Sequence, residues 1–212
     1  MLRIFTAAVP PFMKNGYLVA ADASAAAVLI DPGDEVDELI VRAATEGLAV
    51  GVILLTHAHL DHITGVAQAR TAFGVDVWLH RDDDFLYGAV EQQGQMFGLR
   101  VKTQPPVDRF YEPGQRLMVG GLEIGVHSTP GHSPGGVCLE IREASTPQLF
   151  VGDTLFAGAI GRTDLPGGDY DTLIRSIRTV LFAFPDPTPV HSGHGPSTTI
   201  GQERRTNPYL QP

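Results

Sequence analysis

The chain has 212 residues, of which 43% are hydrophobic and 18% are charged, and its formal net charge at pH 7 is −9. This balance is typical of a soluble globular protein with a sizeable core. Proteins that bind nucleic acid or anionic membranes need clusters of Lys and Arg, which this acidic sequence lacks, so we expect neither partner.

Predicted strands and helices alternate in the first half of the chain. Short apolar, β-branched segments predict strands at residues 1–6, 16–20, 25–31, 50–56 and 75–80. Apolar residues at helical spacing predict helices at about residues 35–46, 62–73 and 82–93. The segment 50–56 is apolar throughout, which is typical of a strand that is covered on both faces.

The pattern changes in the second half, where several strands follow one another before the next helix. This half begins with a hairpin at residues 116–127, which turns at Gly120 and Gly121. Strands at 136–141 and 148–153, a helix at about 170–182 and a strand at 188–193 follow. Because no flexible linker or change in composition separates the halves, we expect one α/β domain over residues 1–212.

The N-terminal segment and the cysteine content indicate the compartment. Pro10 and Pro11 interrupt the first apolar stretch, which does not resemble a secretory signal, and no segment has the length of a membrane span. Cys138 is the single cysteine, so no internal disulfide can form. We therefore expect a cytoplasmic protein.

The segment LLTHAHLDHITG, residues 54–65, places His57, His59, Asp61 and His62 directly after a predicted buried strand. Loop residues two positions apart point the same way, so His57 and His59 can face one point. A chance H-x-H-x-D-H motif is expected in about one such chain in a thousand. The alternative, a set of solvated loop histidines, is therefore the weaker interpretation, and the motif predicts a metal site.

Three further candidate ligands follow predicted strands: His132, Asp153 and His194. Loops at strand ends are where α/β proteins usually build their sites. Imidazole and carboxylate ligands suit zinc, iron or manganese, and the lack of thiolate argues against a structural zinc. Seven ligands exceed the need of one tetrahedral ion, so we expect two divalent ions that share a carboxylate and a hydroxide.

These motifs, THAHLDH, PGH, GDTLF and GHG in this order, resemble the metallo-β-lactamase superfamily. The segments DTLFAGAIGRTDLPGGDYDTLIRSI and GHGPSTTIGQERRTNPYL are similar to its short glyoxalase-II-like members, the hydroxyacylglutathione hydrolase-like metallohydrolases. The resemblance covers essentially the whole chain. It implies an αββα sandwich of two mixed sheets flanked by helices, with the metals at one edge between the sheets.

The resemblance also implies a role for each candidate ligand. The first ion would take His57, His59 and His132, the second would take Asp61, His62 and His194, and Asp153 would bridge them. Asp61 is also the implied catalytic residue. In the family, a water between the metals is ionised at neutral pH and attacks a carbonyl, and the metals then stabilise the oxyanion.

Arg162 is the candidate substrate-binding residue, because longer glyoxalase II enzymes place a basic glutathione contact there. Asp164 falls near a position where those enzymes use a tyrosine. Only a short segment follows His194, so we expect no counterpart of the helical tail with which those enzymes hold glutathione. The thiol carrier of the substrate therefore stays open.

Other acidic residues and histidines allow structural interpretations. Asp31 either accepts a hydrogen bond from a ligand imidazole or caps the turn at Pro32-Gly33. His191 is either a donor behind the metal ligands or a packed loop residue. His80 and His127 are expected to be structural, and the run at residues 81–84 to be a solvated helix start.

Three activities compete. The first is hydrolysis of a small-molecule thioester, with S-lactoylglutathione as the expected substrate and a monomer or homodimer as the expected assembly. The second is a mono-iron glutathione persulfide dioxygenase, whose family shares HITG and GRTD with residues 62–65 and 161–164. The third is the tRNA-maturing branch of the superfamily, which the acidic charge disfavours. A non-catalytic metal-binding module is a poorer alternative.

Overall fold

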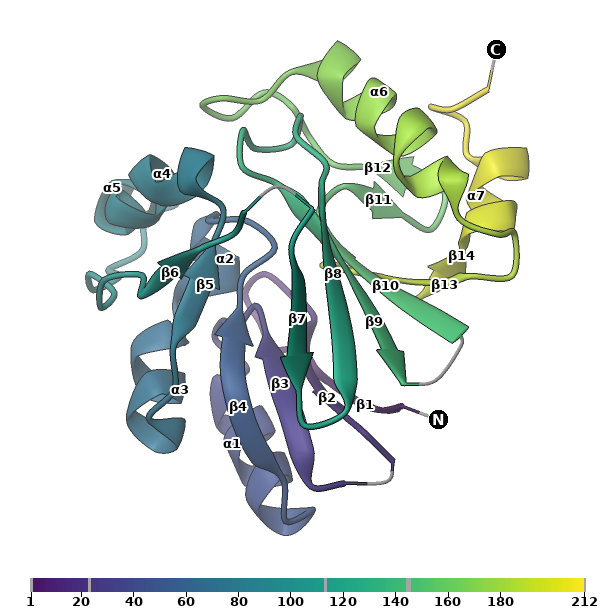
Figure 1. Ribbon diagram of the computed structural model, residues 1–212. Coiled ribbons are helices and arrows are strands. Elements are labelled where there is room, and N and C mark those ends of the chain that lie inside the picture. The colour runs from purple at the N-terminus through teal and green to yellow at the C-terminus, as the bar shows by residue number, and fades with distance from the viewer. Residues whose placement is uncertain (1, 23, 113, 144–145, 212) are drawn as a thin grey trace.

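The computed structural model describes residues 2–22, 24–112, 114–143 and 146–211. Two β-sheets pack face to face, and helices lie on the outer side of each sheet (Figure 1). The expected αββα sandwich of two mixed sheets is therefore confirmed. No helix among the described residues is long and apolar enough to cross a membrane.

The first sheet contains six strands from the N-terminal half: β1 (Arg3–Ala7), β2 (Gly16–Ala20), β3 (Ala26–Ile30), β4 (Ala49–Leu54), β5 (Val77–Leu79) and β6 (Arg109–Phe110). β1 to β3 are antiparallel neighbours, whereas β3 to β6 run parallel. Parallel neighbours need crossover connections. Helices α1 (Val36–Thr45) and α3 (Val66–Phe73) provide them, and they pack on β1 with β2 and on β4, respectively.

The second sheet has the strand order β14-β13-β10-β9-β8-β7. Its strands are β7 (Arg116–Val119), β8 (Leu122–Ser128), β9 (Val137–Glu143), β10 (Thr146–Gly152), β13 (Pro189–Ser192) and β14 (Thr198–Thr199). Only the β10–β13 pair is parallel. Helices α6 (Tyr170–Thr179) and α7 (Ile200–Thr206) cover its outer side, next to the small sheet of β11 (Leu155–Phe156) and β12 (Ala159–Ile160) (Figure 1).

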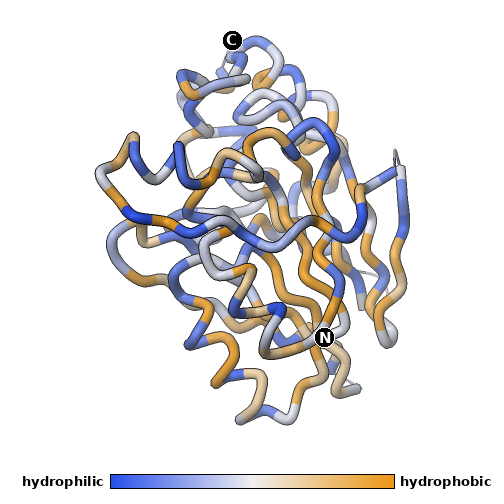
Figure 2. The backbone as a smooth tube through the Cα atoms, turned by 90° about the vertical axis from the view of Figure 1, so that its left-hand side faces the viewer, coloured by the Kyte–Doolittle hydropathy of each residue, from blue (hydrophilic) through white to orange (hydrophobic). Residues whose placement is uncertain are grey.

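Apolar side chains fill three layers. One cluster lies between the sheets and takes residues from both, such as Val28, Val126 and Phe150. A second lies between the first sheet and its helices, and a third, which includes Leu173 and Ile177 of α6, lies behind the second sheet. The central strands are therefore covered on both faces, which explains their continuous apolar sequence (Figure 2).

Several expected helices are divided in the structure. The helix expected at 62–73 consists of α2 (Leu60–Ile63) and α3. The chain breaks at Gly65, whose amide donates to the Pro32 carbonyl at 3.0 Å and where a Cβ would lie 2.3 Å from the Gly33 oxygen. The tight approach of a distant loop therefore ends α2.

The segments expected at 82–93 and 170–182 are also divided. The first forms a 3₁₀ helix η1 (Arg81–Asp83), α4 (Asp84–Gly88) and α5 (Val90–Met96), and the second forms α6 and a 3₁₀ helix η2 (Leu181–Ala183). Helix α7 and the short strands β6, β11, β12 and β14 were not expected, because two-residue strands and a seven-residue helix carry little periodicity.

Candidate metal centre

The candidate ligands converge at one edge of the sandwich, because each follows the end of a strand. His57 and His59 lie in the loop after β4, and Asp61 and His62 lie on α2, directly after that loop. The remaining three follow other strands: His132 after β8, Asp153 after β10 and His194 after β13. The sheets thus bring residues that are up to 137 positions apart in the sequence (57 to 194) into one cluster.

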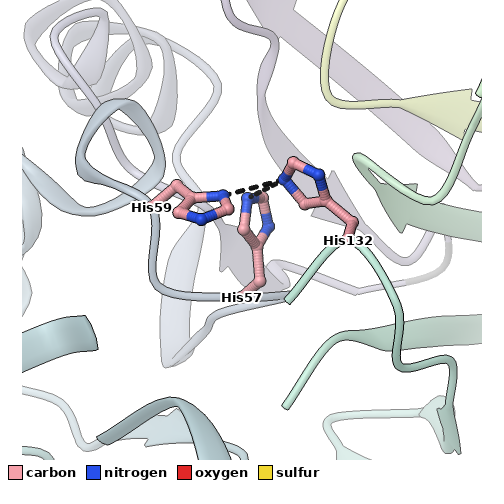
Figure 3. Close-up of side chains that lie close together, drawn as sticks. All are labelled: His57, His59 and His132. Carbon is pink, nitrogen blue, oxygen red and sulfur yellow. Dashed lines mark hydrogen bonds between the residues drawn. The ribbon is translucent and has the colours of Figure 1, made fainter. Parts of the chain in front are cut away.

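His57, His59 and His132 form the first group (Figure 3). His132 Nε2 lies 2.8 Å from His59 Nδ1 and 3.3 Å from His57 Nε2, and all three side chains are buried. The other His132 nitrogen, Nδ1, is 2.7 Å from the carbonyl oxygen of Arg162. If Nδ1 carries the proton and donates to that carbonyl, Nε2 presents a lone pair to the group.

Burial keeps His57 and His59 uncharged in the metal-free protein. Burial, together with the nearby imidazole of His132, lowers the pKa of His59 to about 3. Burial and the neighbouring imidazoles, with His62 first among them, lower the pKa of His57 well below its ordinary value. Neutral imidazoles with converging nitrogen atoms are the ligands that zinc and iron prefer.

Asp61, His62 and His194 form the second group. Asp61 Oδ2 lies 3.1 Å from His194 Nε2 and 3.7 Å from His62 Nε2. Burial lowers the pKa of His62, but the carboxylates of Asp61 and Asp153 outweigh burial and raise it to about 10. In the metal-free protein a proton therefore provides the positive charge that these carboxylates require.

Asp153 lies between the two groups. Its Oδ1 is 3.3 Å from His62 Nε2, and its Oδ2 is 3.5 Å from His194 Nε2 and 3.7 Å from His132 Nε2. Although burial raises the pKa of Asp153, the nearby His62 holds it well below the ordinary value. An ionised carboxylate that reaches both groups can bridge two cations.

Buried polar atoms without partners show that this cluster fits a metal. In the part of the chain that the structure describes, His62 Nε2 and Asp153 Oδ1 are buried and form no hydrogen bond, and the same is true of His59 Nε2. Buried polar atoms rarely lack a partner. The His62 and Asp153 atoms face each other inside the cluster, where a divalent cation would satisfy both.

Asp31 contacts the imidazole of His62 from behind. Its carboxylate accepts hydrogen bonds from Thr56 N at 2.7 Å and Thr56 Oγ1 at 2.6 Å, and Asp31 Oδ2 lies 3.0 Å from His62 Nδ1. The carboxylate therefore faces Thr56 and His62 instead of the turn that follows. Because Asp31 holds Nδ1, the other nitrogen of His62 is left free for the cluster.

Asp83 corrects the prediction of a solvated run at residues 81–84. Its side chain is 0% exposed and accepts hydrogen bonds from Ala58 N, Ser133 Oγ and Gly135 N at 3.0, 2.8 and 2.5 Å. Asp83 thereby joins the loop of His57 and His59 to the loop of His132. No local pattern distinguishes it from its acidic neighbours, so sequence reasoning missed it.

The remaining histidines have contacts outside the cluster. His191 stacks on Phe150 at 4.8 Å and bonds to Gln148 and Ser197, which agrees with the packed-residue interpretation and not with a donor behind the ligands. His127 pairs with Glu140 at 2.7 Å, and His80 accepts a hydrogen bond from Asp82 N at the start of η1. These contacts agree with the structural roles expected for both.

A cleft of about 210 Å³ opens onto the cluster. Its apolar lining residues are Phe12, Leu60, Phe97 and Leu165. Arg162 also lines the cleft, but its guanidinium is already paired with Asp164, with Nε–Oδ1 at 2.7 Å and Nη2–Oδ2 at 2.8 Å. An anionic ligand at Arg162 would therefore compete with the Asp164 carboxylate.

Sequence comparisons identify relatives of the whole chain. The family described as the metallo-β-lactamase superfamily matches residues 9–196. The hydroxyacylglutathione hydrolase GloC of Haemophilus influenzae is 42% identical over 204 residues, which are 95% of each chain.

Solved structures resemble the same fold. BLEG-1, a B3 metallo-β-lactamase, superposes with a TM-score of 0.91 at 38% identity over 100% of both chains. TTHA1623, solved in a di-iron-bound form, gives a TM-score of 0.86 at 42% identity and covers 97% of this chain and 100% of its own. ETHE1 from Myxococcus xanthus gives 0.80 at 28% identity, with 97% and 83% coverage.

Proposed function

We propose that this chain, which belongs to the metallo-β-lactamase superfamily, hydrolyses a thioester of the S-2-hydroxyacylglutathione type, such as S-lactoylglutathione. Its relatives indicate a metallohydrolase as the general class of enzyme. The single observation that carries the hydrolysis is the pair of ligand groups that meet at Asp153 on the floor of the cleft, and the 42% identity to the hydroxyacylglutathione hydrolase GloC supports the thioester as substrate. Two such groups suit a pair of divalent ions, zinc or iron.

When bound, such ions supply Lewis acidity and a hydroxide at neutral pH. His57, His59 and His132 would hold one ion, Asp61, His62 and His194 would hold the other, and Asp153 would contact both. His132 and His62 would be oriented by the Arg162 carbonyl and by Asp31, respectively.

Asp61 would act at the cleft floor. Burial raises the pKa of Asp61, but the nearby His62 outweighs burial and lowers it, so the carboxylate is ionised. Because Asp61 lines the cleft, its carboxylate is able to orient a water or accept its proton there. The apolar walls around Phe12 and Leu165 would limit the access of bulk water, which strengthens each of these interactions.

The second candidate is a glutathione persulfide dioxygenase. The segments HITG and GRTD and the similarity to ETHE1 favour it, and the di-iron form of TTHA1623 is consistent with iron in this fold. A mono-iron enzyme would use one ligand group. Asp61, His62 and His194 complete a second group within 4.8 Å, and this completeness supports the hydrolase.

The test uses purified protein loaded with zinc or iron. We expect close to two metals per chain, and equal hydrolysis of S-lactoylglutathione with and without oxygen. Asp153→Ala should lose both ions and the activity, because the bridging carboxylate contacts both groups. A β-lactam and glutathione persulfide are assayed in parallel. One iron per chain with oxygen consumed on glutathione persulfide, or turnover of the β-lactam alone, would contradict the proposal.

A further inference from the structure

The second ligand group is assembled from opposite sheets. Asp61 and His62 lie on α2, which follows a strand of the first sheet, whereas His194 lies in the loop between β13 and β14 of the second sheet. An ion bound by this group therefore depends on a fixed distance between two separate structural units. A contact between the segment around α2 and the β13–β14 loop, made by residues other than the ligands, would set the distance between Asp61 or His62 and His194.

The segment just before β2 holds the loop of His194. The main chain of Lys14 forms an isolated β-bridge with His194, and Asn15 N donates to the Gly193 carbonyl at 2.7 Å. The Asn15 side-chain amide donates to the carbonyl oxygens of Ser192 and Gly195, on either side of Gly193 and His194, at 3.0 and 2.8 Å. Lys14 and Asn15 thus hold the backbone at His194 from one side, and Gly152 accepts a hydrogen bond from the Gly193 amide at 2.7 Å.

The side chain of Lys14 extends in the other direction, towards His62. Its ammonium donates to the carbonyl oxygen of Asp31 and pairs with Glu35 Oε1 at 2.6 Å. Asp31 has a φ of 49°, a left-handed conformation that a non-glycine residue rarely adopts and that persists only when its surroundings fix it. Lys14 therefore fixes the backbone of the residue whose carboxylate contacts His62 Nδ1.

The packing around the pair leaves no free space. A Cβ at Gly33 would lie 2.0 Å from the carbonyl oxygen of Asp61 and 2.9 Å from Lys14 Cε, and a Cβ at Gly16 would lie 1.9 Å from Glu35 Oε1. The Lys14–Glu35 pair thus lies directly against the turn that carries Asp61. Two glycines are needed to bring these groups so close together.

Stability alone does not account for this arrangement. Lys14 and Glu35 are each 2% exposed, and a buried ion pair usually stabilises a fold no more than apolar residues of the same volume would. What an apolar side chain cannot supply is a directed hydrogen bond to the Asp31 carbonyl. The charge pair is therefore best explained by the position that it imposes.

We propose that Lys14, paired with Glu35, is a positioning residue for the second metal ion. Its backbone holds His194, and its ammonium holds Asp31 and through it His62. Among the described hydrogen bonds, Lys14 makes no contact with the first group. Asp83 joins the loops of that group, and Asp31 reaches His57 only through Thr56. The inference rests on the ligand groups of the proposed function, but it does not depend on the substrate.

The experiment measures zinc binding by the full-length protein after metal removal. Lys14→Met with Glu35→Gln removes the pair without leaving an unpaired buried charge. We expect the first zinc to bind with unchanged affinity and the second to bind about 10- to 100-fold more weakly, the effect usual for groups that orient a ligand. Metal per chain and competition with a chromogenic chelator report each ion separately, without any substrate.

His127→Gln with Glu140→Gln is the matched control, because it removes another pair of a base and a buried acid, away from the ligands. This control should keep both ions. Asn15→Ala loosens the hold on His194 without touching a buried charge, and it should also weaken the second ion alone. The proposal is overturned if both zinc ions bind to the Lys14 and Asn15 variants as in the wild type, or if both ions weaken equally.

Discussion

Asp31→Asn tests the role of the residue behind His62. Asp31 Oδ1 accepts from the Thr56 amide, and Oδ2 accepts from Thr56 Oγ1 and lies 3.0 Å from His62 Nδ1. The Thr56 amide cannot reorient, so the asparagine must keep its oxygen there and present its NH₂ group to the other two partners. The Thr56 hydroxyl can rotate and accept, but the Nδ1–H of His62 then faces a second donor.

The size of the effect follows from this conflict. A hydrogen bond to a charged group contributes about 1.5–3 kcal/mol, so its loss corresponds to roughly 10- to 150-fold in the affinity of the ion that His62 holds. If His62 instead moves its proton to Nε2, that nitrogen can no longer act as a ligand. Either response weakens the second ion selectively.

Chelator competition with zinc, followed by the rate of S-lactoylglutathione hydrolysis at saturating metal, measures both consequences. Asp34→Asn is the matched control, since Asp34 lies in the same turn, is exposed and bonds only to Thr64 among the hydrogen bonds described. Unchanged zinc affinity and rate in Asp31→Asn, with a lower unfolding temperature alone, would refute the reasoning and leave Asp31 with a purely structural role at Thr56.

Two further predictions concern the cleft and the metal-free protein. Arg162→Ala should raise KM for S-lactoylglutathione about two- to fivefold at unchanged kcat. Asp164→Asn should lower KM, because it frees Arg162 from its ion pair. A fall in kcat alone in Arg162→Ala would place Arg162 in the chemical step instead. In EDTA-treated protein, folded His59 takes up a proton only near pH 3, whereas the unfolded chain does so near 6.5. The unfolded state therefore binds more protons at His59 in this window, so the contribution of His59 to the free energy of unfolding should fall as pH falls from 6.5 towards 3. Urea titrations of His59→Gln at pH 5 and 7 should show a smaller gain in the free energy of unfolding with rising pH than the wild type does. An identical pH dependence in the two proteins would show that His59 is already exposed.

The sequence predicted those features that depend on neighbouring residues. The continuous apolar run before His57 predicted a strand covered on both faces, and the structure buries β4 between α3 and the second sheet. The spacing of His57, His59, Asp61 and His62 placed four polar side chains at the end of that strand, and the structure gathers them at one edge. Both features are local, because strand periodicity and loop geometry are set by residues only a few positions apart.

Burial of single polar residues was decided by the tertiary structure alone. Asp82, Asp83 and Asp84 are chemically identical neighbours, yet only Asp83 is buried, because the loops at Ala58 and at residues 133–135 supply its donors. Lys14 likewise gives no sign in the sequence of its contact with Asp31, 17 positions away. Such roles depend on partners that the fold brings in from distant segments, and a buried charge is tolerated only where those partners compensate for its lost hydration.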